Sequence, residues 1–334
     1  MKRIAMLVLL LAAPAFAQDS YDQLLSHWIY DPSTPLNVRL DRLEVRQGGI
    51  HVNEMVYSSP VGDRAKFVGP NGGEVTAYAV MPNGKGPFPA AIYGHWCMPG
   101  SEMMNRKEFL EEAIMLARSG VMSLLPDHVT VHPGFVADRS PMNEQQVAVE
   151  VQEDINLRRG MDWLLASKYV DPQRVAYVGH SCGANAGAFL SGIDKRFKAF
   201  VIMAGNLSDE VNMKSKMFQE YRQKVGAEKL DAFQAKYSWL DPGKYVPHAA
   251  PAAMFLQYAT DEPFISGEIV KGYLALVSEP KKLKMYEAPH ALNAEATRDR
   301  IAYLAEQLSF APPDAKTVAA IPALVQPPWP KAAQ

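Results

Sequence analysis

From Val52 onward the sequence alternates between short apolar runs and longer stretches with helical periodicity. The short runs are rich in Val, Ile, Tyr and Ala, as β-strands are, and turn-forming residues separate them from the helical stretches. A chain that repeats strand and helix in this order is expected to form a mostly parallel sheet covered by helices, of class α/β. Eight strands are predicted, at residues 53–57, 74–80, 90–93, 121–125, 174–178, 199–203, 253–258 and 283–286. Helices are predicted at residues 106–118, 144–167, 184–191, 265–277 and 294–308.

The fifth predicted strand ends in a turn that contains a serine between two glycines. Residues 179–183 read G-H-S-C-G, and small residues that suit a helix follow them. A sharp strand-to-helix turn leaves no room for side chains two residues before and after the serine, which explains both glycines. The turn presents the hydroxyl of Ser181 at the sheet edge, beside the positive end of the next helix. G-x-S-x-G in this context predicts that Ser181 is a nucleophile.

With this motif the chain resembles the α/β-hydrolase superfamily, and more closely its dienelactone hydrolase-like and prolyl-oligopeptidase-like branch. The resemblance extends from about Tyr30 to Phe310. Residues 87–95 are similar to the third strand and oxyanion loop of that branch, and residues 159–175 are similar to its helix leading into the nucleophile strand. The resemblance implies an α/β-hydrolase fold with an eight-stranded sheet and a small helical insert after the sixth strand, at residues 208–247. Aromatic side chains and methionines of this insert either line a substrate pocket or pack the insert onto the core.

A serine hydroxyl is a poor nucleophile unless a base takes its proton and a carboxylate orients that base. In this fold the chain order is nucleophile, acid, histidine. Only two of the eight histidines follow Ser181. His248 precedes the seventh strand and any suitable acid, so it fits the order badly. His290 follows the last strand and precedes the last long helix, which matches the position of the family's base, and is therefore predicted as the base.

The acid of the family commonly lies in the loop after the seventh strand, where this chain has Asp261 and Glu262. Asp261 is predicted to be the acid and Glu262 is the alternative. Either carboxylate would otherwise cap the next helix. Asp209, after the sixth strand, is a remoter candidate because some relatives place the acid there.

A tetrahedral intermediate needs N–H donors aimed at its oxygen. One donor is expected to be the backbone N–H of Cys182, the residue after the nucleophile. The second is expected in the loop after the third strand, at His95 or Trp96. Many members of the family have His-Gly here, whereas this chain reads Tyr-Gly-His-Trp at residues 93–96, so the sequence leaves the donating residue open. The side chains of His95 and Trp96 either shape an acyl pocket or simply pack.

The chain has two cysteines, and the predicted fold brings them near each other. Cys97 follows the oxyanion loop and Cys182 adjoins the nucleophile. In an oxidising compartment they could form a disulfide that braces the site. The alternative is a pair of buried free thiols, which are common in protein cores.

The N-terminus has the layout of a cleavable secretory signal, with Lys2 and Arg3, an apolar run and small residues at Ala15 and Ala17. The expected organisation is a signal peptide at residues 1–17, an N-terminal arm at 18–50, the hydrolase domain at 51–311 and a Pro- and Ala-rich tail without chemistry at 312–334. The apolar run is too short for a stable membrane anchor, so export to the periplasm or medium is expected.

Charge and metal-ligand spacing exclude several functional classes. Without Lys2 and Arg3 the 34 basic side chains become 32 against 36 acidic ones, a net charge near −4, which does not suit a nucleic-acid partner. No Cys/His cluster has zinc spacing, so neither a metal nor another cofactor is expected.

The sequence thus predicts a serine esterase acting through an acyl-enzyme on a small-molecule or polymer-attached ester, with oligomeric state open. A peptidase is the main alternative, although the chain lacks the length for a propeller. Strict dienelactone hydrolysis is disfavoured because that enzyme uses a cysteine nucleophile. A non-catalytic binding protein on this fold is the third alternative.

Overall fold

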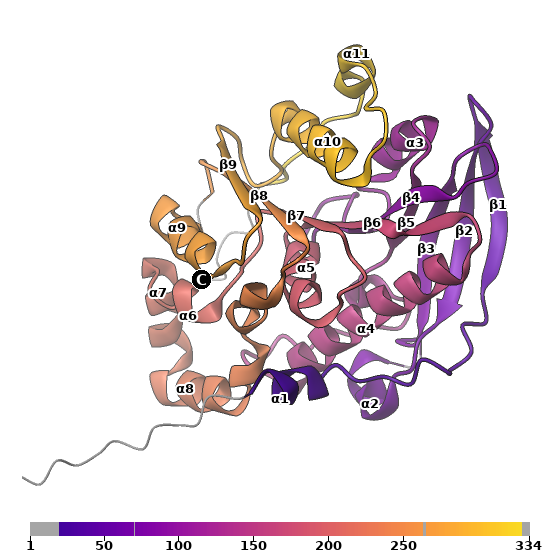
Figure 1. Ribbon diagram of the computed structural model, residues 1–334. Coiled ribbons are helices and arrows are strands. Elements are labelled where there is room, and N and C mark those ends of the chain that lie inside the picture. The colour runs from indigo at the N-terminus through magenta and orange to yellow at the C-terminus, as the bar shows by residue number, and fades with distance from the viewer. Residues whose placement is uncertain (1–19, 70, 263–264, 329–334) are drawn as a thin grey trace, which may run out of the picture.

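A single sheet runs through the molecule, with helices on both of its faces (Figure 1). The computed structural model describes residues 20–69, 71–262 and 265–328. Its strands are β1 (Arg39–Arg46), β2 (Ile50–Ser58), β3 (Glu74–Met81), β4 (Phe88–Gly94), β5 (Met122–Pro126), β6 (Val170–His180), β7 (Ala199–Met203), β8 (Ala253–Ala259) and β9 (Lys281–Tyr286). The longer helices are α3 (Leu110–Arg118), α4 (Glu144–Ala166), α5 (Cys182–Ile193), α7 (Lys216–Val225), α8 (Ala227–Lys236), α9 (Gly267–Leu276) and α10 (Ala294–Leu308).

The strand order is β1-β2-β3-β5-β4-β6-β7-β8-β9, and the six strands from β5 to β9 are parallel to one another. β1, β2 and β3 pair antiparallel at one edge. The predicted α/β class and mostly parallel sheet are confirmed. Parallel strands bring their carboxyl ends to the same edge of a sheet, so the loops after β4, β6, β8 and β9 can meet there.

The core has two layers because successive side chains of each strand point to opposite faces. In β6, Val175 and Tyr177 face one layer, whereas Ala176 and Val178 face the other. The first layer is covered by α4, α5 and α9, and the second by α3 and α10. Strands buried on both faces read as continuous apolar runs, which is why the sequence located them well.

The prediction of eight strands is one short. The additional strand, β1, lies at the antiparallel edge of the sheet and is mostly exposed along its length. Its sequence, RLDRLEVR, mixes charges with apolar residues and lacks the clean alternation of a half-buried strand. The sequence therefore predicts only an N-terminal arm at residues 18–50, whereas in the structure this region contributes β1 and the short helix α1 (Tyr21–Ser26).

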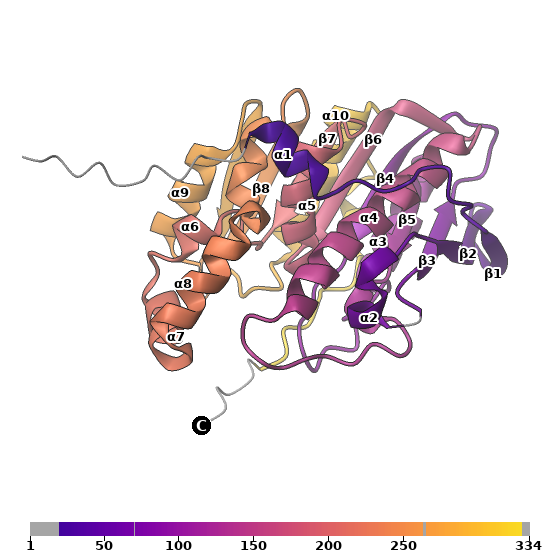
Figure 2. The same ribbon diagram turned by 90° about the horizontal axis from the view of Figure 1, so that it is seen from below.

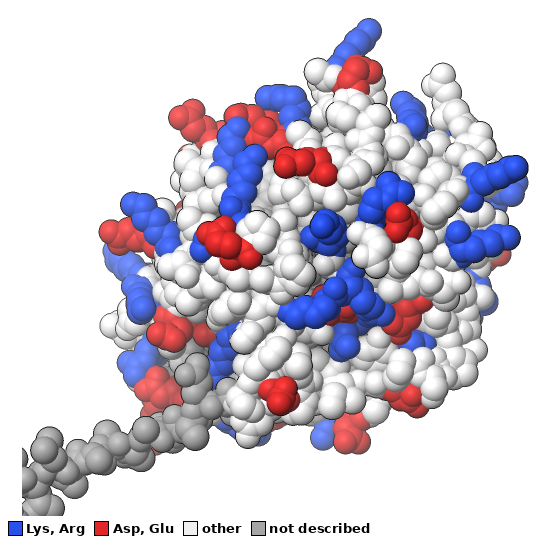
Figure 3. All heavy atoms as spheres, viewed as in Figure 1, with Lys and Arg blue, Asp and Glu red and all other residues white. Residues whose placement is uncertain are grey.

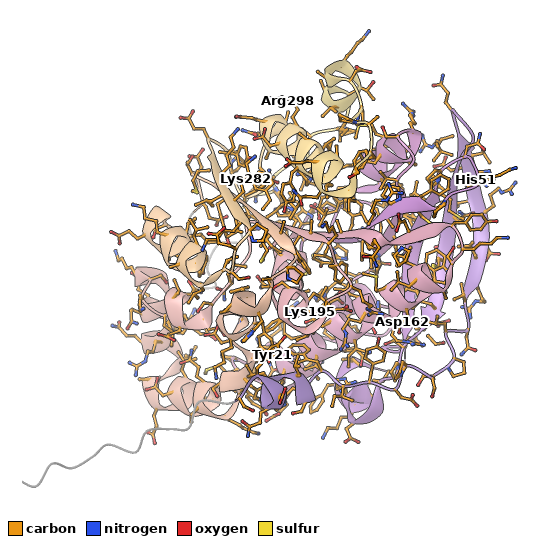
Figure 4. The ribbon with its side chains drawn as sticks, viewed as in Figure 1. Tyr21, His51, Asp162, Lys195, Lys282 and Arg298 are labelled. Atoms are coloured by element: carbon orange, nitrogen blue, oxygen red, sulfur yellow. A yellow bond between two sulfur atoms is a disulfide. The ribbon has the colours of Figure 1, made fainter. Side chains whose placement is uncertain are left out.

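The N-terminal arm is anchored across α4 and α5. Trp28 is buried against Val151, Ile155 and Phe189, and its indole N–H donates to the hydroxyl of Tyr245 at 2.9 Å. Asp162 on α4 accepts hydrogen bonds from the Tyr30 hydroxyl at 2.9 and 3.0 Å. Figure 2 shows α1 and the following segment crossing this side of the molecule, and Figure 4 labels Tyr21 and Asp162 there.

The predicted insert at residues 208–247 is present as α6 (Asp209–Asn212), α7, α8 and three short 3-10 turns. Of its aromatic residues, Trp239 packs in the cluster of Trp28, and Tyr237 bonds to Glu144 at the start of α4. These two side chains therefore attach the insert to the body. The predicted tail contains the short helix α11 (Ala315–Ala319), and Val318 packs in the core beside α10.

The surface is mixed in sign. On the face shown in Figure 3, basic and acidic side chains are interspersed. In the part of the chain that the structure describes, no helix has the length and apolar character needed to cross a membrane. The predicted signal peptide at residues 1–17 lies outside the described residues.

A disulfide joins Cys97, in the loop after β4, to Cys182, the first residue of α5. The two Cα atoms are 5.7 Å apart and the residues are separated by 85 positions in sequence. Of the two alternatives that the sequence left open, the structure has the bridge. It connects two neighbouring parallel strands, β4 and β6, where both end.

This cross-link should contribute strongly to stability, because it closes a long loop and so restricts the unfolded chain. Replacing both cysteines (C97A and C182A together) is expected to lower the free energy of unfolding by about 2–4 kcal/mol. Urea denaturation of the oxidised protein and of the variant measures the difference. Reduced wild-type protein is the matched control, since only the bond changes, and it should unfold near the variant. Equal denaturation midpoints for all three would contradict a stabilising role.

Candidate active site

Ser181 lies in a strained turn between β6 and α5. Its φ and ψ are 55° and −111°, a conformation that is rare for a residue with a side chain. The turn is anchored by the N–H of Ser181, which donates to the carbonyl of Met203 at 2.9 Å. An outlier of this kind at the end of a central strand is typical of a nucleophile turn.

The turn is possible because three glycines let the backbone segments approach closely. A Cβ atom on Gly183 would overlap the carbonyl of Gly94, and a Cβ atom on Gly179 would overlap the carbonyl of Gly183. The N–H of Gly183 donates to the carbonyl of His95 at 3.2 Å. As the sequence predicts, there is no room for a side chain at Gly179 or Gly183, and the same is true at Gly94.

His290 lies in the loop between β9 and α10, and its side chain is 8 % exposed. Its Nδ1 is 2.5 Å from Oε2 of Glu262, whose side chain is 1 % exposed. A carboxylate at Nδ1 requires that this nitrogen carries the proton, which leaves Nε2 as the basic nitrogen of the neutral ring. The geometry is that of a histidine oriented by a buried acid.

The prediction of Asp261 as the acid is wrong, and the alternative, Glu262, partners His290. The N–H of Asp261 donates to the carbonyl of Ala288 at 3.1 Å, but its side chain is exposed and accepts a bond from the Thr260 hydroxyl at 3.3 Å. The two neighbouring side chains differ in direction, since that of Glu262 is buried against His290 and that of Asp261 is exposed. The sequence carried no signal for which of the two carboxylates faces His290.

The remoter acid candidate, Asp209, starts α6 in the insert. Its Oδ1 accepts a hydrogen bond from Asn206 at 2.7 Å, and burial, reinforced by Asp241, raises its pKa to about 6. The other histidine after Ser181, His248, stacks on Tyr21 of the N-terminal arm with ring centroids 3.8 Å apart. Both residues make these local contacts, and neither contacts the pair formed by His290 and Glu262 in any bond given above.

The structure bears differently on the candidate oxyanion donors Cys182, His95 and Trp96. The N–H of Cys182 is at the first position of α5, where no preceding turn of helix supplies a carbonyl. The N–H of Trp96 donates to Oε2 of Glu108 at 2.6 Å. That bond engages the N–H of Trp96, so the prediction of Trp96 as a donor is wrong, whereas the prediction of His95 as the second donor stays a prediction.

The side chains of His95 and Trp96 pack in the interior. The His95 ring accepts the N–H of His128 at Nε2 (2.9 Å), so its Nδ1 carries the proton and donates to the carbonyl of Trp96 (2.7 Å). Burial lowers the pKa of His95, which keeps this ring neutral. The Trp96 ring is fully buried and stacks on His180 and His290, with centroids 5.2 and 6.4 Å away.

Sequence reasoning missed the part of the tail that reaches the site. Gln326 accepts the N–H of Ala291, next to His290, at 3.1 Å. Leu324 packs against Trp96, Met98 and Ala291. A cavity of about 360 Å³ lies between this segment and residues 100–111, lined by Met103, Lys107, Glu108, Leu324 and Val325 among others. The tail, predicted to be extended and to carry no chemistry, therefore packs beside the loop of His290.

Within residues 20–69, 71–262 and 265–328, no three His, Cys, Asp or Glu side chains are grouped so that they could hold a metal ion. The site consists of a serine, a histidine, a carboxylate and backbone donors.

Residues 148–311 match the model of a family described as the prolyl oligopeptidase family. A search of curated protein sequences found no match. Among solved structures, the chain is similar to an acetyl xylan esterase from Paenibacillus sp. R4, with a TM-score of 0.65 and 15 % identity over 86 % of this chain and 93 % of that one. For acetyl xylan esterase 1 from Thermoanaerobacterium sp. JW/SL YS485 the TM-score is 0.66 at 12 % identity, over 86 % of this chain and 92 % of that one.

The structure of a putative dienelactone hydrolase from Klebsiella pneumoniae subsp. pneumoniae MGH 78578 gives a TM-score of 0.54 at 17 % identity, over 78 % of this chain and 98 % of that one. Identities this low establish the fold alone, whereas the family match to residues 148–311 spans the strands and loops that carry Ser181, Glu262 and His290. The chain has the fold of the α/β-hydrolase superfamily, and its nucleophile turn and the family match to residues 148–311 agree with this similarity.

Proposed function

We propose that the protein is a serine hydrolase that cleaves carboxylic esters through an acyl-enzyme. The observation that carries the proposal is the buried hydrogen bond between His290 and Glu262, on the loops beside the strained turn of Ser181. A neutral histidine oriented by a carboxylate is the base that a serine nucleophile needs. The similarity to structures named acetyl xylan esterase and glucuronoyl esterase adds support from the fold.

In the proposed reaction, Nε2 of His290 takes the hydroxyl proton of Ser181 as the serine oxygen attacks the ester carbonyl. The N–H groups of Cys182 and His95 stabilise the negative charge on the carbonyl oxygen. When the intermediate collapses, His290 gives its proton to the departing alcohol and the acyl group remains on Ser181. A water molecule, deprotonated by the same histidine, then attacks this ester. As the second intermediate collapses, the bond between the acyl group and Ser181 breaks, His290 returns the proton to the serine oxygen, and the acid is released. Glu262 stabilises the imidazolium formed in both steps.

A peptidase is the second candidate, because the matching family is described as the prolyl oligopeptidase family. The same residues would attack an amide, whose leaving amine must be protonated by His290. Comparing nitrophenyl esters with proline-containing peptide nitroanilides distinguishes the two candidates by the ratio of their kcat/KM values.

We also propose that the protein is exported. The signal-like layout of residues 1–17 supports this, and so does the disulfide between Cys97 and Cys182, since such bonds persist in oxidising compartments. The mass of the protein recovered from an exporting host would check cleavage after Ala17.

Removing the nucleophile should abolish turnover. Ser181→Ala is expected to lower kcat on nitrophenyl acetate by at least about 1,000-fold and to prevent labelling by a fluorophosphonate probe, because both need the serine oxygen. Ser191→Ala is the control, since Ser191 is a buried serine on the same helix that only bonds the carbonyl of Ala188. Turnover or labelling retained in Ser181→Ala would refute the assignment.

The two adjacent carboxylates should behave differently. Glu262→Gln keeps the size of the side chain but removes the charge that stabilises the imidazolium, so kcat should fall by roughly 100- to 10,000-fold. Asp261→Asn, the matched control, should stay within about threefold of wild type because its side chain is exposed. Steady-state ester kinetics of both variants decide between the acids, and a larger loss in Asp261→Asn would reverse the assignment.

A further inference from the structure

Glu108 lies just before α3, and its carboxylate is buried between two loops of the candidate active site. Its side chain is 3 % exposed. Oε2 accepts the N–H of Trp96 at 2.6 Å, and Oε1 is 2.6 Å from Nδ1 of His180. Trp96 follows His95 in the oxyanion loop, and His180 immediately precedes Ser181. One carboxylate thus joins the loop after β4 to the nucleophile turn.

His180 extends the connection to a third loop. Its side chain is fully buried, and Nε2 is 2.9 Å from the carbonyl of His290. Because a carbonyl only accepts, Nε2 must carry a proton. Nδ1 and Oε1 of Glu108 are both acceptors unless one of them is protonated, so a second proton lies between them on one of the two atoms. The ring therefore uses both of its nitrogens, one toward Glu108 and one toward the backbone of the base.

The segment that carries Glu108 is itself fixed on both sides. The disulfide at Cys97 holds its beginning. The N–H of Arg106 donates to Oδ1 of Asp127 at 2.8 Å, and the guanidinium of Arg106 forms an ion pair with the same carboxylate and with Glu54. Glu108 is therefore presented from a rigid support rather than from a mobile loop.

We propose that Glu108 and His180 are positioning residues that hold the oxyanion loop, the nucleophile turn and the His290 loop in register. The inference rests on the proposed function and deepens it. Neither side chain is assigned a reacting atom: both carboxylate oxygens of Glu108 and both ring nitrogens of His180 are committed to these contacts. Their effect reaches the reaction through the positions of His95, Ser181 and His290.

If Glu108 acts by positioning the loops, Glu108→Ala and Glu108→Gln should differ in kcat. Glutamine can keep both contacts: its amide oxygen accepts the N–H of Trp96, and its amide nitrogen donates to Nδ1 of a singly protonated His180. Alanine loses both contacts. A misplacement of about 1 Å can cost on the order of 100-fold in rate. We expect kcat to fall 10- to 100-fold in Glu108→Ala with little change in KM, and to stay within about fivefold of wild type in Glu108→Gln.

His180→Phe tests the same connection from the other side, since it keeps a ring against Trp96 but removes both hydrogen bonds. Its kcat should fall as in Glu108→Ala, and the double variant should lose little more than either single one, because both act through one network. Glu111→Ala is the control, as Glu111 is an exposed residue on α3. Fluorophosphonate titration of active sites corrects each rate for unfolded protein.

Hydrogen exchange provides a readout that does not depend on turnover. Amide exchange in residues 95–98 and 290–292 should accelerate together in Glu108→Ala and His180→Phe, but not in Glu108→Gln or Glu111→Ala. Wild-type kcat in Glu108→Ala, equal losses in Glu108→Ala and Glu108→Gln, or exchange that rises in only one of the two loops would overturn the positioning role. Wild-type protein without ester turnover would instead refute the proposed function, and the exchange pattern would still test the coupling of the loops.

Discussion

The close approach of three glycines is the constraint on which the candidate site depends. Gly94, Gly179 and Gly183 let the end of β4, the end of β6 and the start of α5 come within backbone contact. A Cβ atom on Gly179 or Gly183 would overlap a neighbouring carbonyl, and one on Gly94 would overlap the Tyr177 hydroxyl. This proximity makes room for the strained conformation of Ser181 and brings the loop after β4 against the helix that follows the serine. The disulfide and the Glu108 contacts then connect segments that the glycines have already brought together.

Buried pairs of ionisable side chains further connect the elements around the site. Glu108 with His180, Glu112 with Arg300, and Glu262 with His290 each have side chains that are at most 8 % exposed. An unpaired charge at these depths would be strongly unfavourable, so each partner depends on the correct placement of the other. Two of the pairs start from the beginning of α3, which makes this helix a support for the site although it contributes no reacting group.

Much of this architecture was predictable, and the errors have physical causes. β6 and the nucleophile turn carry strong local signals, because buried strands are continuous apolar runs and the turn requires glycines at fixed positions. β1 carries exposed charges and has no such signal. The choice between Asp261 and Glu262 depends on which way adjacent side chains point, and the status of Trp96 depends on Glu108, twelve residues away in sequence. Side-chain direction and non-local hydrogen bonds are not encoded in periodicity.

The contact between Gln326 and Ala291 has a consequence for the order in which the molecule is completed. Ser181 and its turn are made first, and His290 is made more than a hundred residues later. Leu324 and Gln326, which pack beside the loop of His290, are made later still. A nascent chain can therefore form much of its sheet while the candidate site is still unassembled, and the arrangement described here becomes available only after residue 326 has been made.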